Sequence, residues 1–244
     1  MIEVDGLVRD LGGTRVIDGL TFTANGGEIT GVLGPNGAGK TTTMRVLSTL
    51  LRPTAGRVVV AGHDVVDDAI EVRRRIGLVT EEPSLLDRLT VREQLVFSAR
   101  MYDLPDQRID DRIELLVAVL GLEDGIDKRA GTLSKGNRQK AALARALVHD
   151  PPVLLLDEPT ANLDIVAQAG MQQLLRRPDV VEGKTVFLST HVLDEAERLC
   201  DRVVGIVGGK TVAAGTPDEI VAATGAASFR DAFLSLVAET TMAE

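Results

Sequence analysis

The chain has few of the features that mark secreted or membrane-spanning proteins. It contains one cysteine, Cys200, among 244 residues, so a disulfide framework within the chain is excluded. No apolar run approaches the roughly 20 residues that a membrane-spanning helix needs. No basic segment followed by an apolar one stands at the N-terminus, so we expect no signal peptide. We therefore expect a protein of a reducing compartment, held at any membrane by another subunit.

The chain also lacks an excess of basic residues. It has 27 Lys and Arg against 36 Asp and Glu, a formal net charge of −9. Nonspecific nucleic-acid binding requires a basic face, so we expect no nucleic-acid partner. The length suits one large domain or two small ones.

The order of apolar segments predicts strands first, then helices, then strands again. Strands are expected at residues 2–4, 18–23, 28–33, 57–61, 153–156 and 185–189. Helical character is expected from about 85 to 148, with Gly121 ending one helix. Gly208-Gly209 indicates a hairpin, and Thr216, with Glu219 three residues later, indicates a capped helix start. This pattern is typical of an α/β core with a helical insertion.

A glycine-rich segment, residues 34–42, fits the phosphate-binding pattern G-x-x-x-x-G-K-[ST]. It follows a predicted strand and precedes a helical pattern at 43–51, so its backbone N–H groups and the helix dipole face a polyphosphate. Lys40 can then reach the β- and γ-phosphates, and the Thr41 hydroxyl can bind Mg²⁺. The predicted loop residues are Gly34, Pro35, Asn36, Gly37, Ala38, Gly39, Lys40, Thr41 and Thr42.

An acid pair follows the apolar run at 153–156. Asp157 is placed to hold Mg²⁺ through water, and Glu158 is placed to polarise an attacking water as a general base. A phosphate loop alone leaves kinases, GTPases and motor ATPases open, and the acid pair narrows that choice.

The segment 133–140 resembles the signature motif, Leu-Ser-Gly-Gly-Gln, of the ABC-transporter ATPases. Ser134 and Gly136 are kept, and they bring a hydroxyl and bare amides to an anion at a helix start. Lys135 and Asn137 replace the third and fifth residues of the motif.

Two further motifs of that family follow in the same order. Residues 161–164, which end in Asp164, resemble its D-loop, and His191 after a predicted strand resembles its switch histidine, which senses the γ-phosphate. The resemblance covers about residues 1–220. The tail at 228–236 is also similar to the ending of exporter-type subunits (ABC-2, sodium or multidrug).

The resemblance implies an α/β fold with a P-loop NTPase core. That core has a mixed, largely parallel sheet, an N-terminal antiparallel β region and a helical subdomain insertion. We expect one ABC ATPase domain at 1–220, with the insertion at about 83–150, followed by a short helical tail at 221–244.

Two positions depart from the family pattern. The family usually places an aromatic ring near Leu11 to stack on adenine, so aliphatic contact is expected instead; Val16 also belongs to the expected ATP-binding set. Glu81 stands at the position of the Q-loop glutamine. Its carboxylate can still bind Mg²⁺, and it adds negative charge beside Asp157 and Glu158.

The family's mechanism implies ATP and Mg²⁺ as cofactors and a head-to-tail dimer, with itself or with a paralogous ATPase subunit. Glu158, His191 and Lys40 are the expected catalytic residues, and Thr41, Asp157 and Glu81 the expected metal ligands. A membrane permease is expected to dock near residues 82–102, where Leu85, Leu86, Leu89 and Tyr102 are candidates for an apolar groove. The chain is then expected to be cytoplasmic, on the inner face of the cell membrane.

Two alternatives to an exporter subunit remain at this point. One is a soluble ABC-type ATPase that acts on a macromolecule, which the acidic charge and the single cassette disfavour. The other is a regulatory module that binds ATP without hydrolysing it, which Glu158 and His191 oppose.

Overall fold

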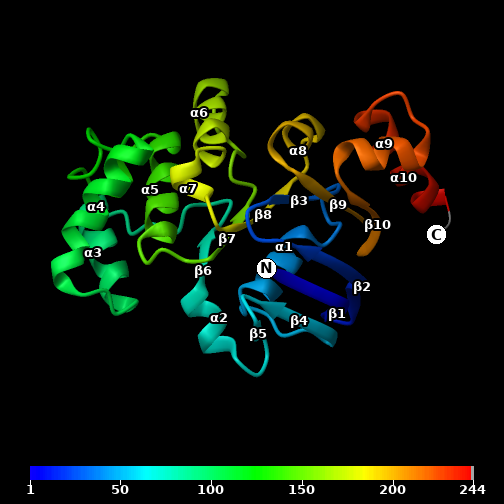
Figure 1. Ribbon diagram of the computed structural model, residues 1–244, viewed down its shortest axis with the longest axis horizontal. Helices are drawn as coiled ribbons and strands as arrows, with labels where there is room; N and C mark the ends of the chain where they lie inside the picture. Colours follow the sequence, from blue (N-terminus) through cyan, green and yellow to red (C-terminus); the bar gives the residue numbers. More distant parts are fainter. Residues whose placement is uncertain (243–244) are drawn as a thin grey trace.

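The computed structural model describes residues 1–242 and follows the predicted α/β order (Figure 1). The strands are β1 Ile2–Leu11, β2 Thr14–Ala24, β3 Ile29–Leu33, β4 Ala55–Val60, β5 His63–Asp64, β6 Ile76–Val79, β7 Val153–Asp157, β8 Thr185–Thr190, β9 Arg202–Val207 and β10 Lys210–Gly215. The helices are α1 Lys40–Leu47, α2 Ala69–Arg75, α3 Val91–Met101, α4 Asp106–Leu120, the 3₁₀ helix η1 Ala130–Thr132, α5 Lys135–Leu147, α6 Ile165–Leu175, α7 Pro178–Val181, α8 Leu193–Leu199, α9 Pro217–Thr224 and α10 Phe229–Met242.

Two sheets form the framework. The central six-stranded sheet has the order β10-β9-β3-β8-β7-β6, and its strands pair in parallel except for β10, which is antiparallel to β9. The second sheet, β2-β1-β4-β5, is antiparallel throughout and comes from the first part of the chain. The predicted mixed sheet and N-terminal antiparallel region are confirmed.

The central sheet is buried on both faces. In β7, Leu154 and Leu156 belong to one hydrophobic cluster, whereas Leu155 between them belongs to the other. Successive side chains of a strand point to opposite faces, so each cluster covers one face. One cluster joins the central sheet to α1 and the antiparallel sheet, where Phe22 of β2 stacks on Phe187 of β8 at a ring-centroid distance of 5.2 Å. The other cluster joins the opposite face to the helices.

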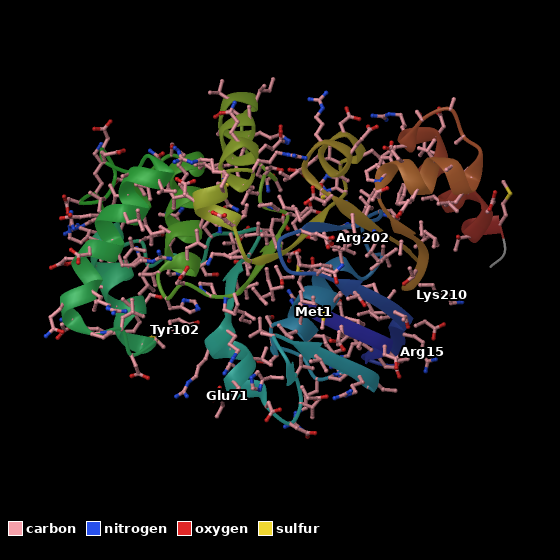
Figure 2. The ribbon with its side chains drawn as sticks, viewed as in Figure 1. Met1, Arg15, Glu71, Tyr102, Arg202 and Lys210 are labelled. Atoms are coloured by element: carbon pink, nitrogen blue, oxygen red, sulfur yellow. The ribbon has the colours of Figure 1, made fainter. Side chains whose placement is uncertain are left out.

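The sheets are also linked at their edge. Arg15 and Lys210, both labelled in Figure 2, pair with the carboxylate of Asp18 at 3.2 and 3.6 Å. The backbone N–H of Asp18 also donates to the carbonyl of Gly209 at 2.9 Å. Strand β2 is therefore fastened to the hairpin that β9 and β10 form.

The helices between β6 and β7 gather at one end of the molecule, and α9 and α10 lie at the other (Figure 1). Helices α3 to α5, which lie between β6 and β7, correspond to the predicted helical insertion. Phe229 and Phe233 of α10 are buried in the helical cluster on the central sheet, so the tail packs on the core. The expected boundary at 220 falls inside α9, and the division of the chain into domain and tail stays a prediction.

Several local predictions are confirmed. Gly121 ends α4 with a left-handed backbone, and Thr216 and Glu219 form a capping box at the start of α9. Cys200 is buried at the end of α8. The helix after the phosphate loop was predicted at 43–51, but α1 begins three residues earlier, at Lys40. It ends at Leu47, because the chain turns at Thr49, which has a φ of 63°.

Among residues 1–242, no single helix has the length and apolar character to cross a membrane. Only α9 and the greater part of α10, taken together, satisfy that test by length and composition, and they are bent by 60° at the break between them.

The close contact between β6 and α5 gives a test of the packing. A Cβ at Gly77 would lie 2.3 Å from the backbone carbonyl oxygen of Ala146, which cannot move without shifting α5. Gly77→Ala is expected to lower the free energy of unfolding by about 1–3 kcal/mol. Thermal unfolding should show this as a fall in Tm of roughly 2–4 °C per kcal/mol for a chain of this size.

The matched control is Gly170→Ala in α6, where a Cβ would meet nothing within 4 Å. Alanine is expected to leave Tm unchanged there or to raise it slightly, since it favours a helix over glycine by about 0.5–1 kcal/mol. An unchanged Tm for Gly77→Ala would contradict the packing of β6 against α5.

Candidate functional site

The glycine-rich loop connects β3 to α1 in a shape that only glycine allows at two points. A Cβ at Gly34 would lie 2.2 Å from the carbonyl oxygen of Ile206. Gly39 precedes α1 with a φ of 106°, and a Cβ there would lie 3.1 Å from the carbonyl oxygen of Val16. The loop therefore passes tightly over β9 and the N-terminal sheet, and α1 begins directly beneath it.

Lys40, the first residue of α1, is buried inside the loop. Its Nζ donates to the carbonyl oxygens of Gly34 at 2.7 Å and Pro35 at 3.2 Å. The same Nζ lies 3.6 Å from Oε1 of Glu158. The ammonium is thus held where phosphate oxygens would meet it, next to the predicted general base.

An open cavity of about 400 Å³ lies over the loop, and half of the predicted site residues line it. Residues from five separate segments line it, namely Val16, Asn36, Gly37, Gly39, Lys40, Thr41, Thr42, Glu81, Glu158 and His191. Leu11 is not among the lining residues, because it ends β1 in a hairpin where it pairs with Thr14. Ala38, which is buried, does not line the cavity either.

Oxygen ligands converge beside Thr41. Its hydroxyl donates to Oδ1 of Asp157 at 3.3 Å, and Glu81 lines an adjoining opening together with these two residues. A hydroxyl and carboxylates are the donors that Mg²⁺ prefers, and Mg²⁺ in such sites takes its remaining ligands from phosphates and water. The three residues therefore fit a magnesium ion bound with a nucleotide.

Glu158 and His191 form a hydrogen-bonded pair at the edge of the cavity. Oε2 of Glu158 lies 2.8 Å from Nδ1 of His191. An ionised carboxylate only accepts hydrogen bonds, so Nδ1 is the donor. Glu158 is 9% exposed, whereas the His191 side chain is 47% exposed. Glu158 also adopts a φ of 49°, uncommon for a residue with a side chain, at the point where the chain leaves β7.

Ser189 is a functional residue that the sequence did not reveal. Its hydroxyl donates to Oδ1 of Asp157 at 2.6 Å and accepts from the backbone N–H of Glu158 at 2.9 Å. The pairing of β7 with β8 places Ser189 opposite Asp157, and nothing in the local sequence shows that pairing. One serine therefore holds both acids of the pair in place.

The signature segment lies apart from the loop of its own chain. Ser134 caps α5 by accepting from the backbone N–H of Asn137, and neither residue lines the cavity over the loop. A Cβ at Gly136 would lie 3.0 Å from that of Ala167, so α5 meets α6 closely there. Lys135 lines a separate opening, together with Glu81.

The D-loop and Q-loop residues contact each other near this second opening. Asp164 caps α6 by accepting from the backbone N–H groups of Val166 and Ala167. The Asn162 side-chain amide donates to Oε1 of Glu81 at 3.4 Å. The segments that carry Glu81 and Asp164 are therefore connected directly.

A groove lies beside the segment where docking was expected, but its lining differs from the predicted apolar residues. A groove of about 400 Å³ lies between α3, α5 and β6, and only Tyr102 of the four apolar candidates lines it. Leu85 packs against the helical core, and Leu86 is 57% exposed outside the groove. The walls come from residues distant in sequence, among them Leu50, Leu78, Ser84, Ser98, Arg145 and His149.

Two stacked rings form part of this groove. Tyr102 stacks on His149 at a ring-centroid distance of 3.6 Å, and it lies on the side of the helices that faces β6 and α2 (Figure 2). Burial lowers the pKa of His149 to about 4, so the ring is neutral near neutral pH. Burial also lowers the pKa of Arg145. The guanidinium nevertheless stays protonated, so the groove contains a positive charge.

Comparison with known proteins agrees with this geometry. The family model of the ABC transporter matches residues 17–161. The chain is 43% identical over 224 residues to the daunorubicin resistance ATP-binding protein DrrA3 of Streptomyces coeruleorubidus, covering 92% of this chain and 71% of that protein. It is 40% identical over 220 residues to the Nod factor export ATP-binding protein I of Burkholderia lata, covering 90% and 72%.

Solved structures show the same fold. The ATP binding subunit of an ABC transporter superposes with a TM-score of 0.87 at 31% identity, covering 96% of this chain and 98% of that one. The dimeric structure of MJ0796, a bacterial ABC transporter cassette, superposes with a TM-score of 0.77 at 26% identity, covering 88% and 98%. The resemblance seen in the motifs is confirmed: the chain belongs to the ABC transporter family, as one of its ATP-binding subunits, which are ATPases coupled to transport.

Proposed function

We propose that this chain hydrolyses Mg-ATP at the cavity over the glycine-rich loop and so drives a membrane exporter. The observation that carries the proposal is the position of Glu158, between Lys40 at 3.6 Å and His191 at 2.8 Å. A regulatory module that only binds ATP has no need of a base held in this way. The relatives named for daunorubicin resistance and Nod factor export support the assignment to export.

Each residue then has a defined task. Lys40 neutralises charge on the β- and γ-phosphates, while the loop amides bind the phosphate oxygens. Glu158 accepts the proton of the attacking water, and His191 keeps that carboxylate oriented and contacts the γ-phosphate. Thr41, Asp157 and Glu81 hold Mg²⁺, which supplies charge neutralisation to the triphosphate when bound.

Two copies are proposed to close head to tail, with the Ser134 segment of each over the loop of the other. Support comes from the absence of Ser134 from the lining of the cavity over its own loop, since an anion site at the start of α5 would otherwise have no nucleotide to bind. A paralogous subunit carrying the same motifs is the alternative partner. ATP is then shared across the interface, and hydrolysis reopens the pair.

A permease helix is proposed to dock in the groove that Tyr102 lines, which ties the chain to the inner face of the membrane. The groove combines the aliphatic residues Leu50 and Leu78 with the charged Arg145, as a helix-binding surface requires. It also joins the helical region to β6, which leads to Glu81 at the cavity. The docking surface is thus connected to the nucleotide site by a short path through β6. No nucleic acid takes part in the proposed function.

The base assignment is tested with Glu158→Gln. Glutamine keeps the size of the side chain but cannot take the proton from water, so steady-state hydrolysis of Mg-ATP should fall by about 10²–10⁴-fold. ATP binding should survive, and gel filtration in ATP should show a dimer that the wild-type chain forms only transiently.

The control for Glu158→Gln is Glu182→Gln, which removes an exposed carboxylate distant from the cavity and should leave hydrolysis unchanged. Wild-type turnover by Glu158→Gln would rule out its role as the base. A wild-type chain that binds ATP but neither hydrolyses it nor dimerises, even with its permease, would favour the regulatory alternative.

The docking groove is tested with Leu50→Glu. Leu50 is 62% exposed, so the change should not disturb folding, but it places a charge on the wall of the groove. Co-purification of the permease from detergent-solubilised membranes should fall by at least roughly tenfold, since docking would then have to remove water from a carboxylate, which costs several kcal/mol.

Ile70→Glu is the matched control for the groove, because Ile70 is similarly exposed, at 65%, and lies on α2 outside the groove. It should leave co-purification and ATP binding at wild-type levels. Equal loss of the permease in both variants would mean that the groove is not the docking surface.

A further inference from the structure

Glu195 is a carboxylate in α8 that the proposed mechanism leaves without a task. It is 2% exposed, the most deeply buried acid among the described residues. No ion pair to it is found in residues 1–242, so its burial is not offset by an opposite charge. A buried carboxylate destabilises a fold unless its oxygens are hydrogen-bonded.

Two threonine hydroxyls supply those bonds. Thr160 donates to Oε1 of Glu195 at 2.5 Å, and Thr190 donates to Oε2 at 2.6 Å. Both threonines are buried, at 5% and 0% exposed. The carboxylate therefore bridges two chain segments whose threonines are 30 residues apart, and each of its oxygens accepts a hydrogen bond from one of them.

These two segments carry the catalytic pair. Thr160 lies two residues after Glu158, and Thr190 directly precedes His191. The Thr190 hydroxyl also accepts from the backbone N–H of Val192 at 3.0 Å, so the backbone is held on both sides of the histidine. The His191 side chain is 47% exposed, so its position depends on its bond to Glu158 and on how its backbone is held.

We propose that Glu195 is a positioning residue that sets the separation of Glu158 and His191. It acts through Thr160 and Thr190 as a brace between the two loops, and it touches neither nucleotide nor water. The inference rests on the proposed roles of Glu158 and His191.

The brace predicts a particular kinetic signature. Loss of the connection lets the two loops move apart, and a displacement of a catalytic group by about 1 Å can cost up to roughly 100-fold in rate. Most contacts that hold the nucleotide are proposed to come from the glycine-rich loop and the start of α1, and Glu195 forms no hydrogen bond to either. The turnover number should therefore fall while KM and the affinity for ATP stay unchanged.

Three variants separate the brace from a general packing role. Glu195→Ala removes both bonds. Glu195→Gln keeps them in another form, since the amide oxygen accepts from one hydroxyl and the amide N–H donates to the other. Glu197→Gln removes an exposed carboxylate from the same helix and serves as the control.

The experiment measures kcat and KM for Mg-ATP, the stoichiometry and Kd of ATP binding, and Tm, on the full chain. Glu195→Ala is expected to lower kcat roughly tenfold, corrected for the fraction that binds ATP, with KM and Kd within about twofold of wild type. Glu195→Gln should restore most of kcat, and Glu197→Gln should match wild type. If kcat falls only in proportion to the fraction of protein that binds ATP, the proposal is overturned in favour of a packing role.

The same substitution in a His191→Ala background tests whether Glu195 acts through the pair. Residues that work as one unit do not add, so Glu195→Ala should cause little further loss of kcat there. An equal further loss in both backgrounds would overturn the brace but leave the roles of Glu158 and His191 intact. Wild-type kcat for His191→Ala alone would instead refute the proposed role of the histidine, and the brace with it.

Discussion

The site depends above all on the position of β8 between β3 and β7. Thr190 pairs with Leu33 on one side, and Ser189 pairs with Asp157 on the other. Parallel strands end at the same edge of a sheet, so the phosphate loop, the acid pair and His191 all leave the sheet at one place. Ser189 fixes this arrangement in detail, because its hydroxyl bonds both Asp157 and the backbone of Glu158. The register of three strands thus decides the chemistry of the cavity.

The helical region meets the central sheet through a close backbone contact between β6 and α5. Gly77 lets β6 touch the backbone of α5 at Ala146. The start of the same helix is fastened by Arg138, which pairs with Asp87 at 2.7 Å and donates to the carbonyl of Ala130 at 2.8 Å. One end of α5 is therefore held against β6, and the other end is held by segments of the helical region itself. In the proposed complex with a permease, a movement at the groove passes to the signature segment through α5, which lines the groove at Arg145 and Ala146.

Features that depend on near neighbours in sequence were predictable, and those that depend on distant pairing were not. The loop at Gly34 to Thr42, the C-cap at Gly121 and the capping box at Thr216 follow from local backbone rules, and the structure has each of them. The roles of Ser189 and Glu195 could not be predicted, because a serine in a strand or an acid in a helix does not show which residues face it in the fold. The predicted lining of the groove was wrong for the same reason, because residues from several elements form its walls and the leucines at 85–89 do not show which residues those are.

Charge is the remaining physical constraint on the cavity. Glu81 and Glu158 line it, and Asp157 lies beside Thr41. Lys40 is the one lysine or arginine among the residues that line the cavity over the loop. A triphosphate adds further negative charge, which the loop amides, the dipole of α1 and a divalent cation offset only in part. In the proposed dimer, the N-terminus of the second copy's α5 brings additional N–H groups to the same phosphates. The terminal phosphate is then the anion that both copies bind, so its loss on hydrolysis removes the attraction across the interface and leaves the carboxylates to favour opening.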